Sequence, residues 1–418
     1  MPYRDNQSND ARKHVCMLAY TFYENDFRVR RYAEALVQEG HDVDVVCLRR
    51  PGESCCVTDN GVRVIRIQRR SVTENSKWLY LFKLLSFFVK SFVVLSLIHV
   101  RRRYHLVHAH NPPDFLVFST LIPKLTGAKI ILDIHDILPE FYVSKFNSGK
   151  GSLVYRSLVL LERMSAKWAD RVILANDIWL SRYVSRSADP AKCTVIINYP
   201  NTSLFSHREG VSNRAGFRFV YPGSLNWHQG LDIAVRAFSS LCERKERCEL
   251  DIYGNGSSRN GLFSLIAELD LDKRVSIHNP VPFTEMPNVM AEADCGIVPK
   301  RAEGFGGEAF STKILEFMAM GIPVIAAATP VDRCYFDDSL ILFFKPGDPK
   351  DLADKMERIM TDSALRKSLV EQGLMFTREN SWENKKVLYN DLVHLLLESG
   401  QDARSRGRIK GGIQPIVH

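Results

Sequence analysis

The chain has 418 residues, of which 45% are hydrophobic and 25% are charged. This length favours two domains, and the composition is ordinary for a soluble globular protein with a sizeable core. The formal net charge of +8 favours an anionic partner such as a nucleotide, an anionic lipid or a nucleic acid, with a generally basic surface as the alternative.

The nine cysteines include no CxxC pair and no His-rich spacing, which excludes the usual zinc-site patterns. The N-terminus, "MPYRDNQSNDARKH", is polar and has no apolar signal-peptide core. Together with the odd number of cysteines, this predicts reduced thiols and a cytoplasmic location.

The first half of the chain alternates short apolar strands with helices. An amphipathic helix over about 28–38, ending at Gly40, follows the first strand. Because the strands are near-continuous runs of Val, Ile and Leu, we expect a parallel sheet covered on both faces. The predicted strands are 15–20, 42–48, 62–67, 106–110, 129–135, 171–175 and 194–198.

The apolar segment Trp78–Arg103 is long enough to span a bilayer. Lys83 and Lys90 interrupt it, and such residues are costly at the bilayer centre. We therefore expect a long helix within the fold, with a spanning helix as the alternative. Its aromatic residues, its lysines and the arginines at its end also suit peripheral contact with an anionic membrane, on the inner face of the cytoplasmic membrane.

After a turn-rich break at 198–216, the alternation of strands and helices restarts. The chain therefore reads as two doubly wound α/β domains, with a ligand cleft between them where the carboxyl ends of the strands face each other. The strands predicted in the second half are 217–223, 248–254, 275–279, 295–299, 323–328 and 340–344.

The stretch "GFGGEAFSTKILEFMAMGIPVI", residues 304–325, places charged residues in an apolar helical pattern. Ser311 or Thr312 is the expected N-cap, the helix runs to Met320, and Gly321 follows its end. We expect the preceding Gly-rich segment to form a flexible turn. Its backbone N–H groups, with the helix N-terminus, would bind a phosphate-sized anion.

Two charges in this helix need a partner. Lys313 lies in the first turn, where the helix dipole disfavours a cation by about 0.3–1 kcal/mol unless a diphosphate is bound there. Glu316 lies between apolar residues, where desolvation is costly unless hydrogen bonds compensate, as a ribose diol can provide. An exposed lysine and a structural salt bridge are the alternatives.

Glu308 and Glu316, with seven residues between them and "FMAMGIPVI" after them, resemble the E-x7-E element of retaining GT-B glycosyltransferases of family 4. The resemblance extends over about 14–398 and includes "YPGSLNWHQGLDIAVRAF", "DIYGNG", "VHAHNPPDFLVF" and "LDIHDILPEFY". It implies an α/β GT-B fold, in which two Rossmann-like domains face each other across a cleft.

The same resemblance implies the domain boundaries. The acceptor-binding domain would be 14–199, the nucleotide-sugar donor domain 200–378, and a helix over 379–398 would pack back on the first domain. The basic, glycine-rich tail 399–418 is expected to be disordered.

Site roles follow from the family pattern. The second glutamate of the element binds the donor ribose and the first lies beside the transferred sugar. A histidine at a strand end contacts the sugar, which makes His135 and Glu308 the expected catalytic residues, with a structural histidine as the alternative. The expected donor-binding residues are Gly223, Ser224, Gln229, Gly254, Val281, Phe305, Gly306, Gly307, Ser311, Thr312, Lys313 and Glu316.

The chain departs from the family pattern where many members carry two basic residues that bind the diphosphate. Ser224 stands in place of the arginine and Gln229 in place of the lysine. Lys313 and the helix N-terminus are therefore expected to stabilise the diphosphate. Further candidate phosphate ligands are Lys300, Arg301 and Arg28.

The resemblance implies transfer of a hexosyl group from a UDP- or GDP-sugar to a glycan or lipid-linked acceptor, with retention of anomeric configuration. The biological setting would be synthesis of cell-surface polysaccharide or glycolipid. No cofactor and no metal are implied, because the nucleotide sugar is a co-substrate and the leaving phosphate takes the acceptor's proton. No nucleic-acid partner is expected, since no helix-turn-helix, RNP or zinc signature accompanies the charge.

Two alternatives share the expected architecture: a UDP-sugar epimerase and a non-catalytic binding partner. The segment "STKILEFMAMG" favours a transferase over an epimerase. The presence together of His135, Glu308 and Glu316 argues against a chain that has lost its activity.

Overall fold

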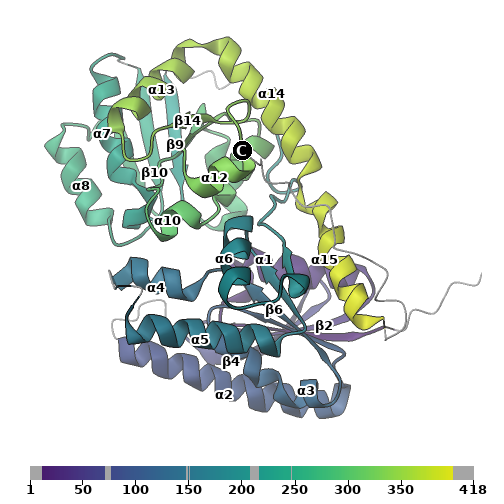
Figure 1. Cartoon of the computed structure of the whole chain (residues 1–418). Coiled ribbons are helices and arrows are strands. Elements are labelled where there is room, and N and C mark those ends of the chain that lie inside the picture. Colours follow the sequence, from purple (N-terminus) through teal and green to yellow (C-terminus); the bar gives the residue numbers. More distant parts are fainter. Residues whose placement is uncertain are drawn as a thin grey trace, which may run out of the picture.

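The computed structural model describes residues 12–70, 77–146, 149, 151–207, 216–245 and 247–398. Two sheets, each flanked by helices, form two lobes that lie one above the other (Figure 1). This confirms the predicted α/β class with two doubly wound domains. The tail 399–418 lies outside the described residues, as does the segment 208–215 of the predicted linker.

The first lobe is built on an eight-stranded sheet of order β3-β4-β2-β1-β5-β6-β7-β8, in which only the edge pair β3–β4 is antiparallel. The strands are β1 (His14–Ala19), β2 (Asp42–Arg49), β3 (Cys56–Asp59), β4 (Val62–Arg69), β5 (Leu106–His110), β6 (Lys129–Ile134), β7 (Arg171–Leu174) and β8 (Cys193–Val195). The sequence had not indicated β3, which is short and exposed.

The helices of this lobe connect successive strands. They are α1 (Phe27–Gln38), α2 (Lys77–Arg102), α3 (Leu121–Leu125), α4 (Leu138–Phe146), α5 (Leu153–Trp168) and α6 (Asp177–Arg186), with short 3-10 segments η1 (Tyr23–Asn25), η2 (Asp114–Thr120) and η3 (Pro190–Lys192). α1 agrees with the predicted helix. Asp26 caps it by accepting a hydrogen bond from the backbone N–H of Val29, and Gly40 follows with a φ of +86°.

α2 is the long apolar helix, and only one of its faces packs against the rest of the lobe. Leu84, Phe87 and Leu95 pack into the core beneath it, while the opposite face is exposed. Within the described residues it is the one helix whose length and composition would allow it to cross a membrane. Its span Leu79–Arg102 has a window of mean hydropathy 2.1, and 22% of that window is buried.

The second lobe has a six-stranded, all-parallel sheet of order β11-β10-β9-β12-β13-β14. The strands are β9 (Phe217–Pro222), β10 (Cys248–Tyr253), β11 (Val275–His278), β12 (Cys295–Val298), β13 (Val324–Ala327) and β14 (Leu342–Phe344). The helices are α7 (Leu231–Cys242), α8 (Arg259–Glu268), α9 (Met286–Met290), α10 (Phe305–Glu308), α11 (Thr312–Ala319), α12 (Pro330–Tyr335), α13 (Pro349–Thr361) and α14 (Ser363–Glu379), with η4 (Trp227–Gln229) and η5 (Phe283–Glu285).

The chain ends by returning to the first lobe. α14 runs down from the second lobe and α15 (Trp382–Leu397) lies on the first (Figure 1). The Tyr389 ring stacks on Tyr32 of α1 with 4.1 Å between ring centroids, and its hydroxyl lies 3.0 Å from His108 Nδ1. Asn390 also donates to Glu39 at 2.8 Å. These contacts fasten the last helix to the first lobe, so the chain crosses between the lobes a second time.

In both sheets the strand order reverses at the first strand, between β1 and β5 and between β9 and β12. Ligands of doubly wound sheets bind at the carboxyl ends of the strands near such a reversal. The topology therefore places the candidate site near His110 on one lobe and near Gly223 on the other.

Close approach of two turns makes Gly254 necessary at the end of β10. Its φ is +151°, and a Cβ there would lie 1.8 Å from the carbonyl oxygen of Gly223. We expect Gly254→Ala to destabilise the protein by about 3 kcal/mol or more, from strain and steric overlap. Urea unfolding measures the effect.

Gly261 is the matched control, because it lies in α8 of the same lobe and an added methyl group would meet nothing within 4 Å. Gly261→Ala should stabilise by about 0.5–1 kcal/mol, since alanine favours a helix. Equal free energies of unfolding for the two variants would contradict the assigned packing.

Candidate functional site

A cleft of about 490 Å³ opens between the lobes. Its walls come from α1, from the end of β6, from the segment after β8, from η5 and from α11. The residues on these walls that carry the chemistry are Arg28, Arg31, His135, Asn198, Thr312 and Glu316. The structure therefore brings His135 and Glu316, from opposite halves of the sequence, to one cavity.

Asp133, near the end of β6, organises the first-lobe side of this cleft. Its carboxylate accepts two hydrogen bonds from Arg28, at 2.8 and 2.7 Å. Nδ1 of His110 and Nε2 of His135 lie 3.1 and 3.0 Å from Oδ2. Burial alone would raise the pKa of Asp133, but Arg28 and His135 hold it well below its ordinary value.

This environment fixes the orientation of His135. Its Nε2 faces a carboxylate, so Nε2 carries a proton and donates a hydrogen bond to Asp133. The backbone N–H of His135 also donates to Asn111 Oδ1 at 2.6 Å. In the neutral ring, Nδ1 is then a hydrogen-bond acceptor.

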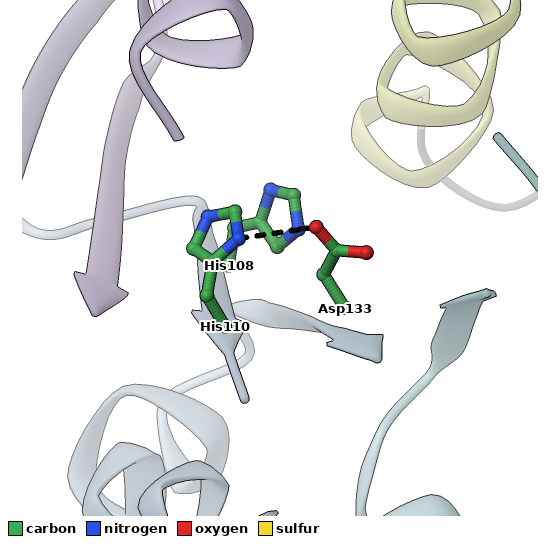
Figure 2. Close-up of side chains that lie close together, drawn as sticks. All are labelled: His108, His110 and Asp133. Carbon is green, nitrogen blue, oxygen red and sulfur yellow. Dashed lines mark hydrogen bonds and ion pairs between the residues drawn. The ribbon is translucent and has the colours of Figure 1, made fainter. Parts of the chain in front are cut away.

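His108, His110 and Asp133 point toward one another from β5 and β6 (Figure 2) and offer three ligand atoms within 4.8 Å of one another. The charge of Asp133 is, however, already balanced by the buried Arg28 guanidinium. A divalent cation would lie next to that guanidinium and be repelled by it. Burial lowers the pKa of both histidines, so that they are neutral and their ring nitrogens can take part in hydrogen bonds. We interpret the cluster as a hydrogen-bonded support for His135.

On the second lobe, α11 begins as the sequence predicted. Ser311 is its N-cap residue, Thr312 its first helical residue, and Gly321 follows its end with a φ of +71°. Thr312 and Glu316 are four residues apart and both line the cleft.

Glu316 is half-buried, and no side chain of the described residues donates a hydrogen bond to its carboxylate. Burial raises its pKa to about 7, although Lys313 partly opposes the shift. A carboxylate in this position has the acceptor capacity that a vicinal diol requires.

Lys313 turns from α11 toward the loop after β9. Its ammonium lies 3.3 Å from the Tyr221 hydroxyl and 3.4 Å from Oε1 of Gln229, two neutral acceptors. Burial and, to a lesser extent, the nearby charge of Lys300 lower its pKa to about 8. Tyr221 in turn donates to the carbonyl of Ser224 at 2.9 Å. Lys313, Ser224 and Gln229 therefore lie together beside Gly223, where a Cβ would be 3.2 Å from the ammonium.

The Gly-rich approach to α11 differs from the expected flexible turn. Phe305 to Glu308 form the short helix α10, preceded by Gly304 with a φ of +60°. A Cβ on Gly307 would lie 1.9 Å from the carbonyl of Ala302, and one on Gly306 would lie 3.0 Å from that of Arg301. These glycines are buried and allow tight packing, and the Phe305 ring lies 5.2 Å from Phe141 of the first lobe.

Glu308 is held by the first lobe. Its carboxylate forms an ion pair with Arg182 of α6, and its backbone carbonyl accepts from Asn176 at 3.0 Å. Arg182 also contacts Glu140, which is paired with Arg186 at 2.6 Å. The first glutamate of the E-x7-E element is thus placed by a charge network that crosses between the lobes.

The region expected to bind the nucleotide base surrounds Val281, which is half-buried between β11 and η5. Phe283 closes this region by stacking on Phe27 of the first lobe, with ring centroids 3.7 Å apart. At the ends of β10 and β11, Tyr253 stacks on His278 with ring centroids 4.2 Å apart. Phe27 and Phe283 line the cleft, so flat rings border it from both lobes.

Three cations considered as phosphate ligands have protein partners instead. Lys300 is buried 3.0 Å from Asp332 and donates to the carbonyl of Ala309. Arg28 uses four hydrogen bonds on Asp133, Ile196 and Asn198. A buried cation bonded in this way has few donors to spare, which argues against direct phosphate contact by either. Arg301 lies 2.7 Å from Asp232 and covers the Trp227 ring.

Sequence reasoning missed several residues of the site. Asp133 and His110 had a signal, because each is polar within an otherwise apolar strand. Arg182 and Tyr221 had none, since an arginine on a helix and a tyrosine in a strand are common in any fold.

Two doubly wound sheets that meet at one cleft, with the last helix returning to the first lobe, define a GT-B glycosyltransferase fold. Sucrose-phosphate synthase from Thermosynechococcus elongatus superposes with a TM-score of 0.77 at 18% identity, covering 93% of this chain and 100% of that one. Anabaena HepE in complex with UDP-glucose gives 0.67 at 16% identity, covering 91% and 99%.

The sequence comparisons identify the family within this fold. The family described as "Glycosyl transferase 4-like domain" matches residues 27–199, and "Glycosyl transferases group 1" matches residues 205–374. The chain belongs to these GT4-type, group 1 glycosyltransferases. Over 289 residues it is 24% identical to alpha-D-kanosaminyltransferase of Streptomyces kanamyceticus, covering 63% of this chain and 70% of that protein. It is also 24% identical over 261 residues to the O-antigen biosynthesis glycosyltransferase WclY of Escherichia coli, covering 58% and 66%.

The buried pair of Asp133 and Arg28 generates a stability prediction. Asp133→Asn leaves the guanidinium buried without its counter-charge, so the free energy of unfolding should fall by about 3–5 kcal/mol. Asp338→Asn is the control, because Asp338 forms an exposed pair with Arg333 and its loss should cost about 0–1 kcal/mol. Urea unfolding of both variants measures the difference, and similar values would contradict the central role of Asp133.

Proposed function

We propose that this chain transfers a hexosyl group from a UDP- or GDP-sugar to an acceptor hydroxyl with retention of anomeric configuration. The observation that carries the proposal is the pair Glu316 and Lys313 on α11. One is a half-buried carboxylate without a side-chain donor among the described residues, and the other a half-buried ammonium that donates only to neutral acceptors. Each lacks the partner that a nucleoside diphosphate would supply.

The ribose is assigned to Glu316, since two adjacent hydroxyls can donate to the two oxygens of one carboxylate. The diphosphate is assigned to Lys313, to the backbone around Gly223 and Ser224, and to the N-terminus of α11. The base then falls beside Val281. This order along the cleft places the transferred sugar toward Glu308 and His135.

The chemistry follows from this arrangement. The bond between the anomeric carbon and the diphosphate oxygen breaks, the acceptor oxygen forms the new bond on the same face, and the acceptor proton passes to the leaving phosphate. Lys313 and the helix N-terminus stabilise the negative charge that develops on the diphosphate. Glu308, placed by Arg182, and the acceptor nitrogen of His135 hold the sugar hydroxyls. Neither residue needs to act as a base.

The relatives support the finer assignments. The structural neighbour HepE is in complex with UDP-glucose, which favours a uridine donor. WclY is named for O-antigen biosynthesis, which favours a role in cell-surface glycan synthesis. The proposal includes a location on the cytoplasmic side of the membrane. We assign this chain no cofactor and no metal, because Lys313 supplies the cationic charge at the diphosphate.

The proposal is tested by incubating the full chain with UDP- and GDP-sugars and candidate glycan acceptors. We expect release of the nucleoside diphosphate and a product whose anomeric configuration, read by NMR coupling constants, matches that of the donor. Inversion of configuration would contradict the assigned mechanism. Conversion of the donor to an epimer, with the diphosphate bond intact, would favour an epimerase.

The shifted pKa values predict how donor binding depends on pH. Glu316 is ionised above about pH 7 and Lys313 is charged below about pH 8, as their shifted pKa values require. Diol binding favours the carboxylate and diphosphate binding favours the ammonium, so affinity should rise through pH 7 and fall through pH 8. UDP-glucose titrated by calorimetry is the suitable probe, because its phosphates do not ionise further in this range.

In Glu316→Gln the rise in affinity through pH 7, the acidic limb of the pH profile, should disappear. Binding should also weaken by about 1.5–3 kcal/mol. Lys313→Met should remove the alkaline limb. Glu303→Gln, a change at an exposed carboxylate of the same lobe, is the control and should leave the profile unchanged. An acidic limb that persists in Glu316→Gln would refute the ribose assignment.

A further inference from the structure

α2 has two apolar stripes, and only one of them is used by the fold. Leu84, Phe87 and Leu95 face the sheet. On the other side Phe82 is 67% exposed, Val89 57% and Leu97 58%. Since large apolar side chains spaced seven and eight residues apart lie on one face of a helix, this helix presents an uncovered apolar surface along its length.

Neighbouring helices extend this surface. α2 and α5 both pack on η2, where Phe88 lies 5.7 Å from Phe115 and Trp168 donates to Thr120. Both helices run along the side of the first lobe that faces away from the second (Figure 1). Further exposed apolar residues lie on α3 and α5. We call the outward surface of these helices the α2–α5 face, with the exposed residues Phe82, Leu85, Val89, Val93, Leu97, Val100, Leu125, Leu153, Leu160 and Met164.

The charge on this part of the chain has a single sign at the surface. Over residues 77–135 and 151–168 the carboxylates are Asp114, Asp133 and Glu162, and all three are buried. Exposed cations surround the apolar strip, and three of them follow one another at the end of α2. The exposed cations are Lys90, Arg101, Arg102, Arg103, Lys129, Arg156, Arg163 and Lys167.

We propose that the α2–α5 face docks on the surface of an anionic bilayer. Apolar side chains would enter the headgroup boundary while the lysines and arginines pair with anionic lipids. A second copy of the chain is a poor occupant, because two such faces would bring basic residues together without exposed carboxylates between them. The anionic bilayer is the partner whose chemistry matches both features.

In this proposal α2 lies on the surface of the bilayer and does not span it. Its inner stripe is fixed to the lobe, with Gln68 donating to the carbonyl of Lys83 at 2.9 Å and His99 Nε2 lying 2.6 Å from the Thr126 hydroxyl. A spanning helix would have to break these contacts and expose the sheet beneath.

Docking also bears on the acceptor, and this step rests on the proposed function. α4 begins at Leu138, three residues after His135, and packs against α5 of the docking face. A lipid-linked acceptor held in the same bilayer would have to reach past α5 and α4 to the first-lobe side of the cleft. Docking itself does not depend on transfer.

The test is co-sedimentation of the full chain with phosphatidylcholine vesicles, with and without phosphatidylglycerol. We expect binding to the anionic vesicles that weakens at high salt, and little binding to the neutral ones. The combined substitution Arg101→Gln, Arg102→Gln and Arg103→Gln should weaken binding on the order of a hundredfold. Val89→Ser, Val93→Ser and Leu97→Ser together should also weaken it.

Lys367→Gln and Phe263→Ser are the matched controls, because they change an exposed cation and an exposed apolar residue on the second lobe. Their binding should equal that of the unaltered chain. Binding to neither vesicle, equal binding to both, or equal loss in the controls would overturn the proposal. Protein that resists extraction at high salt and alkaline pH would overturn it in favour of a spanning helix. Light scattering in which the apolar substitutions abolish a dimer would overturn it in favour of a second copy on this face.

UDP-glucose binding measured on the same samples separates this proposal from the proposed function. Variants that lose vesicle binding and retain donor binding isolate the docking face. A chain that binds vesicles without binding any nucleotide sugar would leave docking intact and refute the transferase assignment alone.

Discussion

Burying charge at the carboxyl ends of two parallel sheets is the constraint on which the site depends. A buried carboxylate is tolerated when donors surround it, and Asp133 has them in Arg28, His110 and His135. Glu316 is half-buried without such donors among the described side chains, and its pKa is raised in consequence. The difference separates a carboxylate whose hydrogen bonds the protein supplies from one that, in the proposed function, a ligand would supply.

The same constraint explains how the lobes are joined. Glu308 of the second lobe forms an ion pair with Arg182 of the first lobe, and the Phe283 ring stacks on Phe27. α15 adds a third connection through Tyr389 and His108. Glu308 and Phe283 are therefore positioned by contacts across the cleft, so the relative placement of the lobes and the geometry of the candidate site are linked.

Much of the fold follows from local sequence, because apolar runs of strand length alternate with amphipathic helices throughout. The limits of α11 were predictable from Ser311 and Gly321, and Glu316 and Lys313 were conspicuous because their charge conflicts with their surroundings. Pairings between distant segments were not predictable. The partner of Arg28 lies 105 residues away and that of Glu308 lies 126 residues away, so only the folded chain reveals them.

One local expectation failed, and another held for only one face of a helix. The glycines at 306 and 307 suggested flexibility, but they form a short helix packed closely on the backbone of Arg301 and Ala302 and on His228. The apolar pattern of α2 suggested a helix within the fold, yet it encoded two apolar faces, of which the sheet covers one. Hydrophobicity in a sequence predicts that a surface will be buried and does not predict which partner buries it.

The most direct measurement of the central claim is a crystal structure of the chain in complex with UDP-glucose. The account predicts the ribose hydroxyls within hydrogen-bonding distance of Glu316, the diphosphate beside Lys313 and Gly223, and the glucose between Glu308 and His135. A nucleotide bound elsewhere, or bound in the cleft with its ribose away from Glu316, would contradict it.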